Sequence, residues 1–212
     1  MQKKVIKYAL SIVALIVVAY NSIYFKSLDE VKAASAVKQF DAASYAHHFF
    51  NKKLMPGIDK AVEIDALLKL VQSDPSKAFL SYSHALGIGN IRYFLVKGEG
   101  TIKAIGENTT TISYISDTTQ KQLEIATEFV YGNAIRDASG LININEFNST
   151  MDFNNVSAEI NKIVRSEVLP SFKANGKVGD RIKFSGAIEL NQAHLNLDHI
   201  EVVPITLKLE SK

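Results

Sequence analysis

The spacing of apolar residues along the chain changes near residue 90, from a helical period to a strand period. Before this point, apolar side chains follow capping residues at helical steps, as Tyr45, Phe49 and Leu54 do after Asp41. Beyond it, apolar and polar residues alternate over most segments. The pattern therefore predicts a helical region followed by a strand region.

The helical region covers residues 27–90 and is expected to form a short collar of helices. Each helix is assigned from a side chain that can accept hydrogen bonds from the first turn, and from a proline or glycine near its end. The expected helices run from the Ser27–Glu30 capping box to about Gln39, from Asp41 to Pro56-Gly57, from Asp65 onwards, and from the Asp74-Pro75 cap towards Gly87 and Gly89.

The strand region covers residues 91–212 and contains five alternating segments and one helix. The helix carries its apolar residues on one face, with Asn154 or Asn155 as its N-cap and Pro170 as its end. In the last segment the alternation slips at Val203-Pro204, which predicts a bulge or an edge position. The five predicted strands cover residues 91–105, 110–115, 122–129, 182–188 and 200–209.

Three strands, one helix and two strands follow one another in the order of the OB-fold, a five-stranded Greek-key barrel. Gly98 and Gly100 fit the first strand, because that strand must bend to serve both sides of such a barrel. The predicted fold class is therefore α+β. It consists of an N-terminal membrane anchor helix, a helical collar, and an OB-like barrel with one helix between strands three and four.

Residues 1–26 have the pattern of an export or anchoring segment. Three lysines precede residue 8, and residues 8–25 carry no charge, which is about the length that a bilayer core requires. Ala19 is followed by Tyr20 and Asn21, which do not suit signal-peptidase cleavage. We therefore expect a single-pass signal anchor in the cytoplasmic membrane, with the C-terminal domain in the periplasmic or extracytoplasmic space; a cleaved signal peptide is the alternative.

Composition and charge narrow the class of protein. The chain has 212 residues, of which 47% are hydrophobic and 22% charged, so it resembles a globular domain with an appendage and not a disordered protein. It has no cysteine, which excludes disulfides and thiolate metal sites. Beyond residue 7 there are 21 basic and 22 acidic residues. A nearly neutral body argues against nucleic acid as a partner.

No catalytic or metal-binding motif is complete. Gly87-x-Gly89 lacks the third glycine of a dinucleotide-binding loop, and the adjacent His47 and His48 point in different directions on a helix. Asn143, Asn145 and Glu146 do not have the spacing of a calcium loop. We therefore expect no enzyme activity, no cofactor and no metal.

Five residues are candidates for ligand binding. Arg136 and Asp137 follow the third predicted strand, where an arginine offers a planar set of donors to a ligand hydroxyl or carboxylate. Arg92, Tyr93 and Tyr131 could lie on the same face. The alternative interpretation is a structural salt bridge for Arg136-Asp137 and a place in the sheet for the tyrosines.

Four sequence blocks stand out by their order and spacing: SHALGIGNIRYFLVKGEGTIKAI, YGNAIRDA, FNSTMDFNNVSAEINKIVRSEVLP and VGDRIKFSGAI. Together they resemble a bacterial family, the predicted periplasmic lipoproteins of domain-of-unknown-function family 2291. The resemblance covers about residues 27–209. Family members typically begin with a lipobox cysteine, whereas this chain has Asn21 near that place, so the apolar helix itself is left as the anchor. Ser149-Thr150 stand where the family often has an Asn-Gln pair.

Genes of this family often lie beside sugar-uptake ABC transporter genes, which implies a role near carbohydrate import. We therefore expect a non-enzymatic, membrane-anchored accessory or binding module. Its expected partners are the membrane through residues 8–25 and either a sugar ABC transporter component or a small carbohydrate. A structural interaction module without a small ligand is the alternative, and an enzyme is the third possibility.

Overall fold

The computed structural model describes residues 40–210, together with residues 6, 8, 12–18, 20 and 27. The chain divides into two units, Met1–Phe40 and Asp41–Lys212. In the first unit, residues 12–18 are helical. The rest of the predicted anchor and the helix expected after the Ser27–Glu30 box lie largely outside the described residues. Within the part that is described, no helix combines the length and apolar composition needed to cross a membrane.

The second unit begins with the helix predicted from Asp41. This helix, α3 (Ala42–Phe49), starts where an Asp41 carboxylate oxygen accepts a hydrogen bond from the Ser44 backbone N–H at 2.9 Å. It continues through a π-helical turn, η1 (Phe50–Leu54), into α4 (Met55–Gly57) and a 3₁₀ turn, η2 (Ile58–Lys60). The α-helical run thus ends at Gly57, as the Pro56-Gly57 pair predicts.

Two further helices follow and are flanked by two short strands. Asp74 caps α6 (Pro75–Tyr82), because its side chain accepts from the Lys77 backbone N–H at 3.0 Å, and Pro75 occupies the first turn as predicted. The helix predicted from Asp65 is α5 (Ile64–Ser73). The two strands are β1 (Val62–Glu63) and β2 (Ser83–His84).

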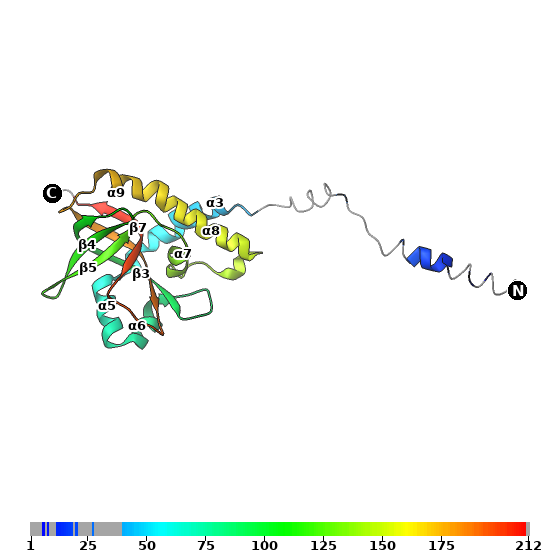
Figure 1. Cartoon of the computed structure of the whole chain (residues 1–212), viewed down its shortest axis with the longest axis horizontal. Coiled ribbons are helices and arrows are strands. Elements are labelled where there is room, and N and C mark those ends of the chain that lie inside the picture. The colour runs from blue at the N-terminus through cyan, green and yellow to red at the C-terminus, as the bar shows by residue number, and fades with distance from the viewer. Residues whose placement is uncertain are drawn as a thin grey trace. The chain divides into compact units, whose positions relative to one another are not determined.

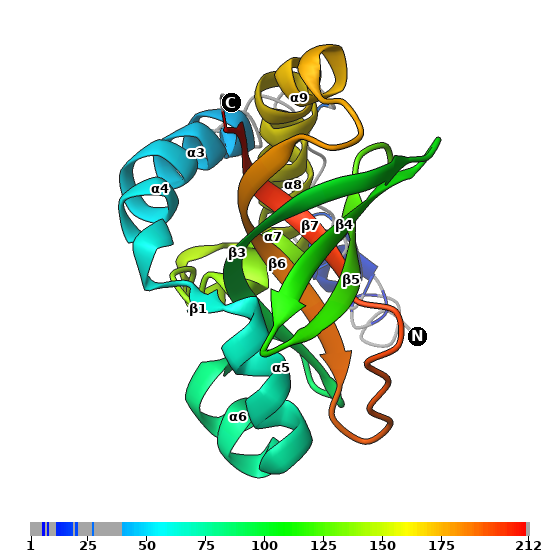
Figure 2. The ribbon, with the colours of Figure 1, turned by 90° about the vertical axis from the view of Figure 1, so that its left-hand side faces the viewer.

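The five long strands form a closed circuit of pairings (Figures 1 and 2). Neighbours pair in the order β3-β4-β5-β7-β6, and β6 pairs back antiparallel along β3. The β5–β7 contact is parallel, whereas the others in the circuit are antiparallel. The strands are β3 (Ile91–Ile105), β4 (Thr109–Ser116), β5 (Thr119–Ala126), β6 (Arg181–Asn191) and β7 (Glu201–Leu209).

The order of strands and helix is the one that the sequence predicts, and the content is α+β as expected. The β6–β7 register shifts so that Ser185 pairs with Thr206 but Gly186 pairs with Pro204. The shift confirms the irregularity predicted at Val203-Pro204. The third strand lies three residues earlier than the predicted span 122–129, because β5 covers Thr119–Ala126 and leaves Phe129 in the following loop.

The predicted boundaries of the long helix are wrong at both ends. Helix α8 (Thr150–Ile163) starts at Ser149, whose hydroxyl accepts from the Asp152 backbone N–H at 3.1 Å, and not at Asn154 or Asn155. Pro170 does not end the helix. It lies in the first turn of α9 (Leu169–Asn175), where a missing N–H costs little, after the π-helical segment η4 (Val164–Val168).

The connection between β5 and α8 also contains structure that the sequence pattern does not reveal. It includes the short helix α7 (Ala134–Ala138) and a 3₁₀ turn, η3 (Ile144–Glu146). Helix α7 packs against β3 and β6, and α3 packs against α8. The residues that follow β5 are thereby held close to the strands.

One hydrophobic core joins the collar helices to the sheet. Helices α5 and α6 lie at one end of the sheet and α9 lies at the other (Figure 2). Phe79 of α6 meets Phe94 of β3 edge to face, with ring centroids 5.1 Å apart. The largest fully buried side chains of this cluster are Phe94, Leu67, Ile102, Ile112, Leu123, Ile125, Ile182 and Ile188.

Gly100 permits the close approach of β3 and β4, which gives a testable prediction. A Cβ atom at Gly100 would lie 2.4 Å from Ile112 Cγ2 and 2.6 Å from the Ser113 carbonyl oxygen. We expect Gly100→Ala to lower the free energy of unfolding by about 1–3 kcal/mol in denaturant titrations. Gly87→Ala is the control, since a Cβ atom at Gly87 would meet nothing within 4 Å. Equal effects of the two variants would contradict this packing.

Candidate functional site

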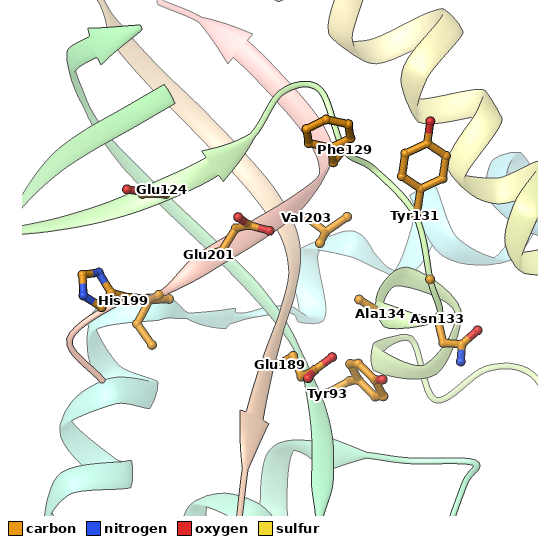
Figure 3. Close-up of a pocket in the computed structure, with 12 residues that line it drawn as sticks. Tyr93, Glu124, Phe129, Tyr131, Asn133, Ala134, Glu189, His199, Glu201 and Val203 are labelled. Atoms are coloured by element: carbon orange, nitrogen blue, oxygen red, sulfur yellow. The ribbon is translucent and has the colours of Figure 1, made fainter. Parts of the chain in front are cut away.

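A groove opens on the side of the sheet that faces away from the core (Figure 3). Its volume is about 680 Å³, within the range of small-molecule sites. Four strands and the segment after β5 contribute to it. We call it the acidic groove, and its lining residues are Tyr93, Glu124, Phe129, Tyr131, Gly132, Asn133, Ala134, Glu189, His199, Ile200, Glu201 and Val203.

The strand register brings the polar residues of the groove together. Tyr93 of β3 is the register partner of Glu189 on β6, and Glu124 of β5 is the partner of Glu201 on β7. Paired residues on adjacent strands project to the same face. Their chain neighbours, such as Phe94 and Ile125, belong to the core, so these four side chains point to the outer face.

Negative charge dominates the lining. Three glutamates line the groove, and no lysine or arginine is among its described lining residues. Partial removal of water from the Glu201 carboxylate, together with the negative Glu124 beside it, raises the pKa of Glu201. Burial, followed by the charge of Glu189, raises the pKa of Tyr93 to about 12. Tyr93 is therefore a neutral hydrogen-bonding group at physiological pH.

Aromatic side chains form the other wall. Phe129 and Tyr131 are each 61% exposed. Figure 3 shows them at one end of the groove, with Tyr93 and Glu189 at the opposite end and Glu201 between. The arrangement offers carboxylate acceptors to donor groups of a ligand and ring faces to its apolar surface.

The backbone of the segment that carries Phe129 and Tyr131 is hydrogen-bonded to side chains of α8 and η4. The Arg165 Nη1 group donates to the Val130 carbonyl oxygen, and its guanidinium lies 4.6 Å from the centre of the Tyr131 ring. One turn earlier, the Asn161 side-chain amide donates to the Gly132 carbonyl oxygen at 2.8 Å. These contacts hold the segment in place before any ligand arrives, which lowers the entropic cost of binding.

The structure brings only two of the five candidate residues into this groove, Tyr93 and Tyr131. Arg92 does not line it, because it alternates with Tyr93 along β3. Arg136 and Asp137 lie in α7 and are buried, with 3% of each residue exposed. The Arg136 Nε–H donates to an Asp137 carboxylate oxygen at 2.7 Å.

Two further contacts hold the buried arginine. Its Nη1 group donates to the Phe153 carbonyl oxygen at 3.3 Å, and its guanidinium lies 3.5 Å from the centre of the Phe153 ring. This geometry matches the alternative interpretation of the pair, a structural salt bridge that ties α7 to α8. Such a pair is not available to a ligand while the fold is intact.

Sequence reasoning missed the groove carboxylates Glu124, Glu189 and Glu201. Each occupies a polar phase of an alternating strand, a pattern that indicates an outward side chain and nothing more. Cross-strand register pairs Glu124 with Glu201, and only the folded sheet shows that Glu189 lines the same cavity. No group of three or more metal-ligating side chains that could hold an ion occurs among the described residues.

Glu201 provides a pH-dependent prediction. A raised folded-state pKa means that the folded protein holds this proton more tightly, so stability falls as pH rises between the ordinary and the raised value. We expect Glu201→Gln to raise the unfolding midpoint slightly at about pH 7, by roughly 1–2 °C for this exposed group. At about pH 3, below the ordinary glutamate pKa of about 4.3, the gain disappears. A lower midpoint for Glu201→Gln at neutral pH would contradict the charge repulsion.

Comparisons with known proteins identify a family and, among the solved structures that resemble this chain, an OB-fold protein. The sequence profile of the family described as "Predicted periplasmic lipoprotein (DUF2291)" matches residues 13–208. The crystal structure of an OB-fold protein from Thermotoga maritima, at 1.90 Å resolution, is similar with a TM-score of 0.71 and 26% sequence identity. The alignment covers 82% of this chain and 100% of that chain. No curated protein matches the sequence.

Proposed function

Because the chain belongs to the DUF2291 family of predicted periplasmic lipoproteins, we propose that it is a non-enzymatic binding module on the outer side of the cytoplasmic membrane, with the acidic groove as its ligand site. The family description supports an extracytoplasmic location. The ligand that we propose is a small carbohydrate. The protein would either deliver it to a sugar ABC transporter component or detect it for that transporter.

The attachment to the membrane requires a different anchor from that of a lipoprotein. These 212 residues contain no cysteine to which a lipid could be linked. We propose that the uncharged segment 8–25 holds the protein in the bilayer, with the preceding lysines on the cytoplasmic side. In alkaline carbonate extraction of cell membranes, the protein is expected to stay in the membrane pellet. Complete release into the supernatant would contradict this anchor.

The single observation that carries the ligand proposal is that one wall of the groove consists of carboxylates and the other of aromatic rings. Glu124, Glu189 and Glu201 present acceptors for sugar hydroxyls. Phe129 and Tyr131 present exposed ring faces on which the apolar face of a sugar ring can lie. A cavity of about 680 Å³ has room for a monosaccharide or a short oligosaccharide.

Thermal unfolding of the full chain in mild detergent, with monosaccharides, short oligosaccharides and nucleosides, tests this proposal. A ligand at 100 times its Kd adds about 2.7 kcal/mol to the stability of the folded state. For a domain of this size the midpoint rises by roughly 5–11 °C. We expect that shift from one sugar class, and its loss in Tyr131→Ala and Glu124→Gln.

Glu107→Gln is the matched control, since Glu107 is an exposed glutamate in the turn between β3 and β4, outside the groove. If no compound shifts the midpoint, the groove is not a carbohydrate site, and docking to a protein without a small ligand becomes the better account. The transporter association would fail if deletion of the gene left the uptake of every tested sugar unchanged.

A further inference from the structure

We propose that the ligand of the acidic groove carries a protonated amino group, so that the preferred class is an amino sugar and not a neutral one. This inference rests on the proposed function, because it specifies the ligand of the same site. It is carried by a cavity with two unlike walls, one of carboxylates and one of aromatic rings.

The carboxylates of the groove come from three different strands and line one cavity. Glu124 and Glu201 are register partners, so two negative groups of neighbouring strands lie side by side on one face. Glu189 adds a third from β6. Among the described residues that line the cavity, His199 is the only side chain that could carry a positive charge.

The ion pairs of the protein do not neutralise these groups. The salt bridges between described residues join other acids to their bases, and none of them includes Glu124, Glu189 or Glu201. The hydroxyls of a neutral ligand can donate to these carboxylates, but they leave the three negative charges uncompensated. An ammonium group donates to the same carboxylates and also brings the opposite charge, so that donor and acceptor are both ionised and attract each other electrostatically.

The aromatic wall suits a cation as well as a sugar ring. An ammonium group is attracted to the face of a phenyl or phenol ring within about 6 Å. Phe129 and Tyr131 line the cavity, and the guanidinium of Arg165 already lies over the Tyr131 ring. One face of the Tyr131 ring is thus already covered by a cation of the protein, so we expect an ammonium group of the ligand to approach the ring of Phe129.

A bare metal ion fits the site less well than an organic cation. No set of three or more ligating side chains that could hold an ion occurs in the described part of the chain. The cavity of about 680 Å³ is more than twenty times the volume of a water molecule, about 30 Å³. A cavity of this size is filled better by an organic molecule that carries the amino group on a larger framework.

Calorimetric titration of the full chain with glucose, N-acetylglucosamine and glucosamine tests the inference, since these three compounds differ only at one carbon. We expect glucosamine to bind at least about tenfold more tightly than the other two at low salt, and the preference to shrink as the ionic strength rises. Glu201→Gln is expected to reduce glucosamine affinity more than glucose affinity. The control Glu107→Gln is expected to leave both affinities unchanged.

A fourth compound, spermidine, separates the amino group from the sugar body. Equal affinity for the three sugars would overturn this inference and leave the proposed carbohydrate function standing. If spermidine binds and none of the three sugars does, the requirement for an amino group is supported and the proposed carbohydrate function is overturned. If none of the four compounds binds, this inference is wrong, and the proposed carbohydrate function is decided by the thermal unfolding panel.

Discussion

Replacement of Arg136 by alanine is expected to destabilise the protein by about 3–5 kcal/mol, because it leaves a buried carboxylate without its partner. Arg136 and Asp137 are both almost inaccessible to water. The guanidinium also donates a hydrogen bond to the Phe153 carbonyl oxygen and lies over the Phe153 ring. Removal of the positive member therefore leaves the Asp137 carboxyl group buried without its ion-pair partner. Denaturant titration of Arg136→Ala measures this loss directly.

Two controls distinguish the buried pair from an ordinary surface pair. The double variant Arg136→Met with Asp137→Leu removes both charges and is expected to recover most of the stability. Arg181→Ala breaks exposed contacts with Glu99 and Glu210 and is expected to cost less than about 1 kcal/mol. If Arg136→Ala lowered the free energy of unfolding as little as Arg181→Ala but abolished ligand binding, Arg136 and Asp137 would have to be assigned to the binding site.

Replacement of Phe94 by alanine is expected to cost about 3–5 kcal/mol, through the loss of apolar burial and the cavity that remains. Phe94 has no exposed surface, and its ring contacts that of Phe79 on α6. The variant thus removes a contact through which the collar helices and the sheet share one core. Chemical denaturation followed by circular dichroism gives the change in the free energy of unfolding.

Leu80→Ala is the matched control for this core substitution. Leu80 lies next to Phe79 on the same helix but is 88% exposed, so its truncation is expected to change the stability by less than about 0.5 kcal/mol. Similar losses from Phe94→Ala and Leu80→Ala would contradict the shared core. Two separate unfolding transitions in the wild type would contradict it as well.

Local patterns predicted those parts of the fold that depend on neighbouring residues. Asp41 and Asp74-Pro75 cap their helices as expected, because a cap is decided within four residues. The five strands follow from alternation, and the slip at Val203-Pro204 corresponds to a register shift. The order of strands around the long helix then led to the OB-fold, the fold of the Thermotoga maritima structure that this chain resembles.

Features that depend on tertiary packing were not predictable in the same way. Asn154 and Asn155 are good caps in isolation, but Ser149 takes that role one turn earlier, since its hydroxyl meets the Asp152 N–H. Pro170 has the pattern of a helix stop, yet η4 supplies the turn that accommodates it. The helix continues because tertiary packing of its apolar face outweighs the local preference.

The candidate site was predicted only in part, for a related reason. Tyr93 and Tyr131 were identified from their residue type. Glu124, Glu189 and Glu201 are ordinary surface glutamates in the sequence, and only the pairing of Glu124 with Glu201 and the folding of the sheet bring all three to one groove. The charges of Arg136-Asp137 favour a binding role, and the burial of the pair and its contact with the Phe153 ring cannot be deduced from adjacent residues alone.

An NMR titration of the isotopically labelled full chain with glucosamine tests most directly whether the acidic groove is the ligand site. We expect the amide signals that shift to cluster at Tyr93, Glu124, Glu189 and Glu201, and in the segment 129–134. We also expect Glu201→Gln to reduce these shifts. Saturable shifts confined to another surface, such as the pocket lined by Lys53, Lys60 and His84, would contradict this assignment, as would no shifts at all.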